Sequence, residues 1–174
     1  MHVTFLLRQI KQGDLALRRL RISDGPFLSR TLGREDILRS SGVCRPGRSP
    51  WIFFHWWLRK TFFVAYCIEL QLRTIGFIGL FNLVPGASAE VSLVLFDPVF
   101  RRRGYGSRAF TMLSGNTFTK AFAHTFIVRV RKDNESARSF WTKLGFETVR
   151  VDGDTIVMVM TKKRLPEGEV KETL

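Results

Sequence analysis

The residues best placed to do chemistry form a short basic loop that contains glycine. An apolar run ends at Asp97-Pro98, arginines occupy positions 101–103, and Gly104 and Gly106 open a helical pattern. The N-terminus of a helix exposes backbone N–H groups and carries partial positive charge, to which the arginines add. Together these groups predict a binding site for a polyanion such as a pyrophosphate.

Two other nucleotide motifs fit this loop less well. Residues 104–109 match the dinucleotide fingerprint G-x-G-x-x-G/A, but residues 97–103 separate the glycines from the preceding strand, which the fingerprint does not allow. A P-loop is excluded because no Gly-Lys-Ser/Thr follows. The alternative without a ligand is a plain turn with a solvated basic patch.

Two segments resemble motifs of the GCN5-related N-acetyltransferase (GNAT) superfamily. Arg101-x-x-Gly104-x-Gly106 resembles motif A, whose pattern is Gln/Arg-x-x-Gly-x-Gly/Ala after the fourth strand, and residues 134–146 are similar to motif B, Asn-x-x-Ala-x-x-Leu/Phe-Tyr-x-x-x-Gly-Phe. The motifs occur in the right order, and the resemblance covers about residues 89–147. It implies an α/β (α+β) fold: a mixed, mostly antiparallel sheet flanked by helices, with an acyl-CoA cleft between the fourth and fifth strands.

The resemblance implies acetyl-CoA or a related acyl-CoA as cofactor, and no metal. The amides of residues 102–107 would hold the pyrophosphate, the main chain of 94–96 would pair with the pantetheine arm, and a backbone amide on that strand would polarise the thioester carbonyl. The implied cofactor-binding residues are Val94, Leu95, Phe96, Arg101, Arg102, Arg103, Gly104, Tyr105, Gly106, Ser107 and Asn134.

The groups that would transfer protons are less well marked. Trp141 stands where many family members carry a tyrosine acid, and its indole has no titratable proton for that role. Arg129 stands where some protein N-terminal acetyltransferases carry a glutamate. Glu90 is the candidate catalytic base and Glu69 a second, each with the alternative of an ordinary strand-end carboxylate. Trp141 would either pack in the core or line the acyl pocket.

The acceptor side of the site is marked by an aromatic segment, 51–57. Trp56 is predicted to line the substrate pocket together with Trp141, and His55 either packs among its neighbours or lines the same pocket. The predicted function is transfer of an acetyl group from acetyl-CoA to a primary amine of a protein N-terminus, such as that of a ribosomal protein, or of a small molecule, by direct attack. The alternative is a non-catalytic acyl-CoA-binding regulatory or nucleic-acid-associated module on the same fold.

The composition bounds the class of protein. The chain has 174 residues, 45% of them hydrophobic, which predicts one domain over 1–165 and a polar tail over 166–174. The 16 phenylalanines predict a bulky core or an aromatic-lined pocket. Cys44 and Cys67 are isolated, which is typical of buried thiols.

The net charge indicates the kind of partner, and the apolar segments indicate the location of the protein. The net charge of +13 attracts anionic partners in general, without predicting specific nucleic-acid binding. Residues 51–70 are apolar, but Arg59 and Lys60 interrupt them, so we expect no membrane span. No signal peptide is expected at the N-terminus. We predict a cytoplasmic protein, monomeric or homodimeric.

The elements that must position these residues follow from periodicity. Alternation and β-branched content predict strands over 14–22, 62–70, 74–84, 90–96, 125–131, 147–151 and 155–161. Helical spacing predicts helices from Ser23 or Asp24, from Tyr105, and from Asn134 or Asp133 to a left-handed cap at Gly145.

Overall fold

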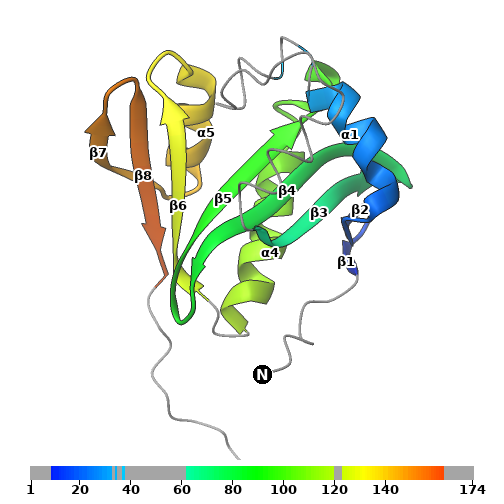
Figure 1. The fold of residues 1–174 in the computed structure, drawn as a ribbon, viewed down its shortest axis with the longest axis horizontal. Coiled ribbons are helices and arrows are strands. Elements are labelled where there is room, and N and C mark those ends of the chain that lie inside the picture. The colour runs from blue at the N-terminus through cyan, green and yellow to red at the C-terminus, as the bar shows by residue number, and fades with distance from the viewer. Residues whose placement is uncertain (1–8, 33, 35–36, 38–61, 120–122, 163–174) are drawn as a thin grey trace, which may run out of the picture.

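The computed structural model describes residues 9–32, 34, 37, 62–119 and 123–162. Eight strands form one sheet in the order β1-β2-β3-β4-β5-β6-β8-β7 (Figure 1). Only β5 and β6, among the described strands, pair in parallel, which confirms the predicted mixed, mostly antiparallel sheet. The strands are β1 (Gln9–Gln12), β2 (Leu15–Arg19), β3 (Phe62–Leu70), β4 (Arg73–Val84), β5 (Ala87–Leu95), β6 (Ala123–Arg131), β7 (Glu147–Asp152) and β8 (Thr155–Thr161).

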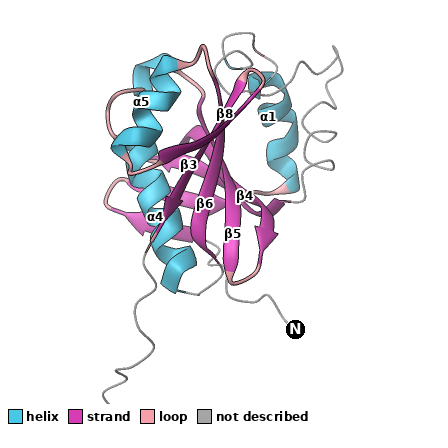
Figure 2. Ribbon diagram, turned by 90° about the vertical axis from the view of Figure 1, so that its left-hand side faces the viewer, coloured by secondary structure: helices cyan, strands magenta, loops and turns pink. Residues whose placement is uncertain are grey.

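Helices cover both faces of this sheet (Figure 2). α4 (Tyr105–Thr119) and α5 (Glu135–Lys143) lie on one face and α1 (Gly25–Leu32) on the other. Two short 3-10 helices, Ile22–Asp24 and Pro98–Phe100, precede α1 and the loop before α4. None of the helices in the described part of the chain is long and apolar enough to cross a membrane.

The core under α4 and α5 is aromatic. The ring of Phe110 lies 5.5–5.6 Å from the rings of Phe126, Trp141 and Phe146, and all four side chains are buried. Such edge-on and tilted contacts suit the quadrupoles of aromatic rings. The phenylalanine content therefore does supply a bulky core, and it fixes α5 against the sheet.

Residues at both ends of α5 set its limits as predicted. The side-chain oxygen of Asn134 accepts the amide of Ala137 at 3.0 Å, which caps the N-terminus. At the other end Gly145 adopts a left-handed φ of 89°. Its amide donates to Thr142 O, and the amide of Phe146 donates to Trp141 O, which is a Schellman motif. The helix that carries Trp141 is thus fixed at both termini.

Three local expectations need correction. β1 was not predicted, because four mostly polar residues carry no alternation signal; it forms by pairing with β2. The β7–β8 turn consists of Gly153 and Asp154, because Asp152 extends the predicted strand 147–151 by one residue and still pairs with Thr155. α1 begins at Gly25, directly after Asp24 as predicted, but a 3-10 helix from Ile22 precedes it; the N-cap of that helix is Arg21, and Asp24 closes its capping box.

Asp24 also belongs to a charged cluster beneath α1. Its carboxylate accepts from Arg18 Nη1 and Nη2 at 3.0 and 2.9 Å and from the Arg21 amide at 2.8 Å. Arg18 Nε also donates to Glu69 Oε1 at 2.6 Å. Burial raises the pKa of the neighbouring Cys67 thiol to about 12, so this cysteine is an unreactive core group, as its isolation in the sequence predicts.

We expect Asp24→Asn to make stability less dependent on pH in the acid range. Partial burial raises the pKa of Asp24, but hydrogen bonds from Arg18 and the Arg21 amide outweigh it and hold the pKa below its usual range. The stabilisation is therefore present above the unfolded-state pKa and is lost as pH falls through the lower folded-state pKa. Urea unfolding should show the variant less stable by about 1–2 kcal/mol at pH 7, with the difference shrinking in acid. A constant difference would contradict the assignment.

Candidate active site

A cleft opens where β5 and β6 separate. The two strands pair from Ala87 and Ala123 as far as Glu90 and Ile127, and beyond that point they diverge toward their C-terminal ends (Figure 1). A cavity of about 210 Å³ lies there, and its lining includes Glu90, Ser92 and Arg129. The split leaves one edge of β5 without a strand partner in the described sheet, and such an edge can accept an extended ligand.

The register of β4 and β5 decides which residues face this open edge. The amide of Phe96 donates to Ile75 O at 2.9 Å, and Val94, opposite Phe77, points to β4 in the same alternation. The backbone groups of Leu93 and Leu95 therefore point toward the open side. This corrects the predicted set of 94–96: the backbone groups of Val94 and Phe96 face β4, and Leu93, which was not in the set, faces the open side.

The loop after β5 presents backbone amides. Arg102 and Gly104 both adopt left-handed conformations, with φ of 59° and 79°, which turn successive N–H groups toward a common side. Gly104 O accepts the first helical bond of α4, from the Arg108 amide at 2.9 Å. The amides of residues 105–107 have no carbonyl partner within α4, because they lie in its first turn. They are therefore available to an anion.

Gly106 joins this loop to the cleft. A Cβ there would lie 3.3 Å from the Phe140 ring of α5 and 3.6 Å from Leu93 of β5. The start of α4, the open strand and α5 thus meet at one residue. The structure therefore places the predicted anion loop beside the cleft, as the order of the two motifs requires.

The arginines around the loop differ in whether their side chains already have partners within the protein. Arg108 is committed elsewhere, because its Nη2 lies 2.7 Å from Asp14 Oδ1 and donates to Gln12 O. Arg101 makes a long contact of 3.4 Å to Leu95 O, while Arg102 and Arg103 are exposed. Of the predicted basic triplet, Arg102 and Arg103 have exposed side chains that a bound polyanion can reach.

Glu90 sits at the narrow end of the cleft in a polar cluster. Its carboxylate accepts from Arg129 Nε and Nη2 at 3.3 and 3.4 Å and from Asn82 Nδ2 at 3.2 Å. The Glu90 side chain is 12% exposed and that of Arg129 is 46% exposed. Arg129 and Glu90 were considered separately in the sequence, but in the structure they form an ion pair across the two strands.

The remaining predicted residues divide into three groups. Asn134 and Trp141 line the cavity, Trp141 also being buried against Phe140 and Phe146, so its packing and lining roles coincide. Glu69 is held by Arg18 and does not line this cavity. The predictions for Trp56 and His55 lie outside the described residues.

A larger cavity, of about 450 Å³, lies between α1 and the start of β4. Phe27, Phe96 and Phe100 line it. We place the site in the smaller cavity because the strand split and the contact through Gly106 to the amide loop meet there. The larger cavity has more volume, but the open edge of β5 and the amide loop do not meet there.

Comparison with known proteins agrees with this geometry. Residues 14–147 match the family described as acetyltransferase (GNAT) domain. The chain belongs to the GNAT family. It is an acyltransferase by class, with the mixed sheet of that fold. A comparison with curated proteins gives no significant match.

Solved GNAT structures share the fold at low identity. Spermidine N-acetyltransferase from Vibrio cholerae, in complex with CoA and spermine, is 18% identical with a TM-score of 0.72, over 88% of this chain and 98% of that one. An acetyltransferase from Salmonella typhimurium that modifies the N-terminal serine of ribosomal protein L7/L12 is 17% identical with a TM-score of 0.72, over 89% and 99%. PaiA N-acetyltransferase from Thermoplasma acidophilum, in complex with coenzyme A, is 19% identical with a TM-score of 0.68, over 85% and 99%.

Two glycines of this GNAT chain allow a matched test of the loop conformation. We expect Gly104→Ala to destabilise the protein by about 1–2 kcal/mol, because a Cβ strains the left-handed backbone although no atom lies within 4 Å of it. Gly115→Ala, equally unobstructed but in the middle of α4, should stabilise it by up to about 1 kcal/mol. Denaturant unfolding measures both. Equal effects would contradict the loop geometry.

Proposed function

We propose that this GNAT protein transfers an acetyl group from acetyl-CoA to a primary amine of a protein N-terminus or a small molecule. The observation that carries the proposal is the split between β5 and β6, which joins an open strand edge to a loop of exposed amides. The first suits the amide-bearing pantetheine arm and the second suits a pyrophosphate. CoA is a ligand of two of the solved relatives, which supports this choice.

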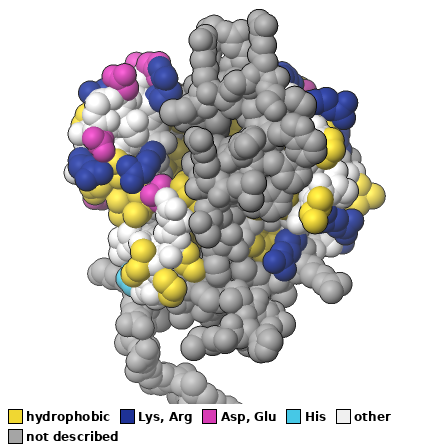
Figure 3. All heavy atoms as spheres, viewed as in Figure 1, with side chains coloured by type: hydrophobic (Ala, Val, Ile, Leu, Met, Phe, Trp, Pro, Cys, Tyr) yellow, Lys and Arg dark blue, Asp and Glu magenta, His cyan; other side chains and the backbone are white. Residues whose placement is uncertain are grey.

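The residues that fit CoA come from three elements. The backbone of Leu93 and Leu95 would pair with the pantetheine arm, the amides of 102–107 with Arg102 and Arg103 would hold the phosphates, and Asn134 would stand on the opposite wall. Among the described residues visible in Figure 3, basic side chains stand in separate groups at the two sides of this face.

The proposed acetyl transfer requires a base for the amine proton and a donor for the carbonyl oxygen. The amine nitrogen forms a bond to the acetyl carbon, the C–S bond breaks, the amine loses a proton and CoA leaves as its thiol. A backbone amide on β5 would stabilise negative charge on the carbonyl oxygen. Among the described residues that line the cavity, Glu90 is the one carboxylate, so we propose that it accepts the amine proton, directly or through water.

Acetyl-CoA binding and turnover test the function. The protein should bind acetyl-CoA by calorimetry and release CoA thiol when given amines from a panel of peptides, polyamines and amino acids. Glu90→Gln should lower kcat by about 100-fold or more while leaving the Kd for acetyl-CoA within about threefold, because Glu90 lies at the far end of the cleft from the loop. Binding without turnover on any acceptor would favour a regulatory protein, and no binding would refute the proposal.

A further inference from the structure

The pair formed by Glu90 and Arg129 is unusually loose for a partly buried ion pair. Its two contacts are 3.3 and 3.4 Å, at the long end for hydrogen bonds to charged groups. Arg18 and Glu69 are 2.6 Å apart, and the neighbouring Arg131 lies 2.7 Å from Asp133. The site thus contains two charges that are near each other but not tightly bound.

The two partners also differ in what they present to the cleft. Glu90 is nearly covered and Arg129 is half exposed. Nε and Nη2 of Arg129 contact Glu90, which leaves Nη1 without a partner among the described contacts of this residue. Arg131 lines the same cavity but is already neutralised by a two-pronged contact with Asp133. Arg129 is therefore the guanidinium with donors to spare at the narrow end.

The phosphates of CoA do not account for this arginine. Glu90 precedes Leu95 by five residues, which spans about 16 Å of strand, and the amide loop begins only after Leu95. The guanidinium of Arg129 contacts Glu90, where the paired part of β5 and β6 ends, and this is the part of the cleft away from the loop, where the acetyl group and the acceptor would meet. An anion recognised by Arg129 thus belongs to the acceptor.

We propose that the acceptor is a small amine that also carries a carboxylate, as a free amino acid does; this rests on the proposed function. The acceptor carboxylate binds Arg129 and displaces it from Glu90, and Glu90 receives the ammonium group. A zwitterion replaces both partners of the pair, whereas an amine without a carboxylate occupies Glu90 and leaves the half-exposed guanidinium of Arg129 with no partner but water, so it gains no charge-assisted hydrogen bond there. The cavity of about 210 Å³ suits a small acceptor.

A matched set of acceptors tests the proposal on the whole 174-residue chain. We would measure CoA release with leucine, leucinamide and 3-methylbutylamine, which share a side chain and an amine but differ in the carboxylate, and repeat the comparison with a second amino acid series. The kcat/KM for amino acids should exceed that for the amides and amines by about 10- to 100-fold. A peptide N-terminus resembles the amide, so a preference for leucinamide or peptides would overturn the proposal.

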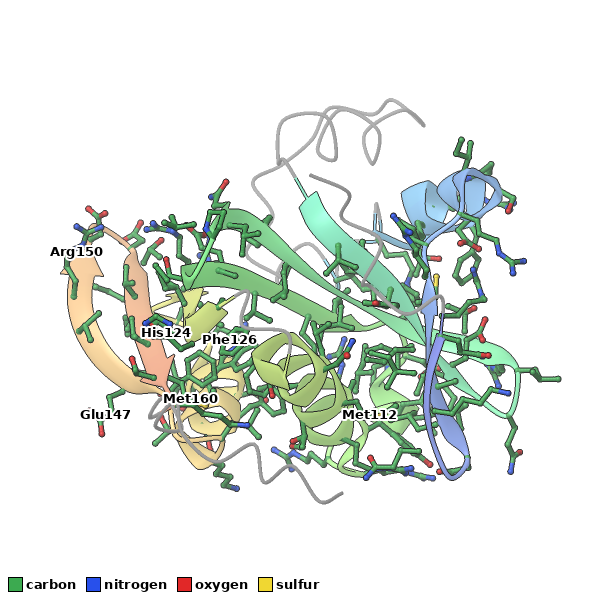
Figure 4. All side chains as sticks on the ribbon, turned by 90° about the horizontal axis from the view of Figure 1, so that it is seen from below. Met112, His124, Phe126, Glu147, Arg150 and Met160 are labelled. Atoms are coloured by element: carbon green, nitrogen blue, oxygen red, sulfur yellow. The ribbon has the colours of Figure 1, made fainter. Side chains whose placement is uncertain are left out.

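Arg129→Gln should remove this preference specifically. The KM for the amino acid should rise about 10- to 100-fold, that for the amide should change little, and Arg129→Lys should restore part of the difference because it keeps the charge but loses the planar fork. Arg150→Gln is the matched control: it removes the same charge from β7, at the outer edge of the sheet (Figure 4), where Arg150 is exposed and paired with Asp152. It should leave both KM values unchanged.

The outcomes separate this proposal from the proposed function. Turnover of amides and amines as fast as amino acids, or an equal loss on all acceptors in Arg129→Gln, would overturn the zwitterion proposal and leave the acetyltransferase intact. Absence of turnover on every acceptor would refute both. Binding of N-acetyl-leucine but not N-acetyl-leucinamide to the CoA complex, lost in Arg129→Gln, would support the carboxylate contact independently of rate.

Discussion

The parallel pairing of β5 with β6, and its early end, is the constraint on which the rest of the site depends. Four residue pairs join the strands, from Ala87 with Ala123 to Glu90 with Ile127. After that the backbone of β5 has hydrogen-bonding groups that no described strand satisfies. Leu93 and Leu95 are only partly buried, so water can reach these groups, and an extended ligand can replace that water by pairing along the edge.

The surrounding elements hold this gap open. The aromatic cluster of Phe110, Trp141 and Phe146 fixes α5 against the sheet beside β6, and Arg108 ties α4 to the β1–β2 turn through Asp14. At Gly106 the two helices and β5 approach so closely that an added Cβ would lie 3.3 Å from the Phe140 ring and 3.6 Å from Leu93. The cleft is therefore bounded by packed elements on the α4 and α5 face, and its polar residues lie on the strands themselves.

Much of this arrangement was predictable from the sequence, for identifiable physical reasons. β3 spans Phe62–Leu70 as predicted, because β-branched and aromatic residues bounded by turn residues are a strong strand signal. Asn134 and Gly145 limit α5 as predicted, because capping depends on local chemistry. The glycine loop was recognisable because left-handed backbone and close approach both select glycine.

The features that were not predictable depend on pairing between distant segments. Leu93 replaces Phe96 at the open edge because the register with β4 decides which amides are free, and one sequence does not encode that register locally. The contact of Glu90 with Arg129 joins residues 39 positions apart, and neither residue alone suggests it. The sequence marks Asp24 as a helix cap, and its carboxylate does accept the Arg21 amide, but its contact with Arg18 depends on the tertiary fold and was not predicted.

Amide hydrogen exchange with and without CoA tests the central claim most directly, because it reports where the ligand lies without requiring turnover. The account predicts slower exchange at Leu93 and Leu95 and at the amides of 102–107 when CoA is bound, with no change around Phe27 and Thr31 at the larger cavity. Protection around the larger cavity, with the edge of β5 and the loop unaffected, would contradict it.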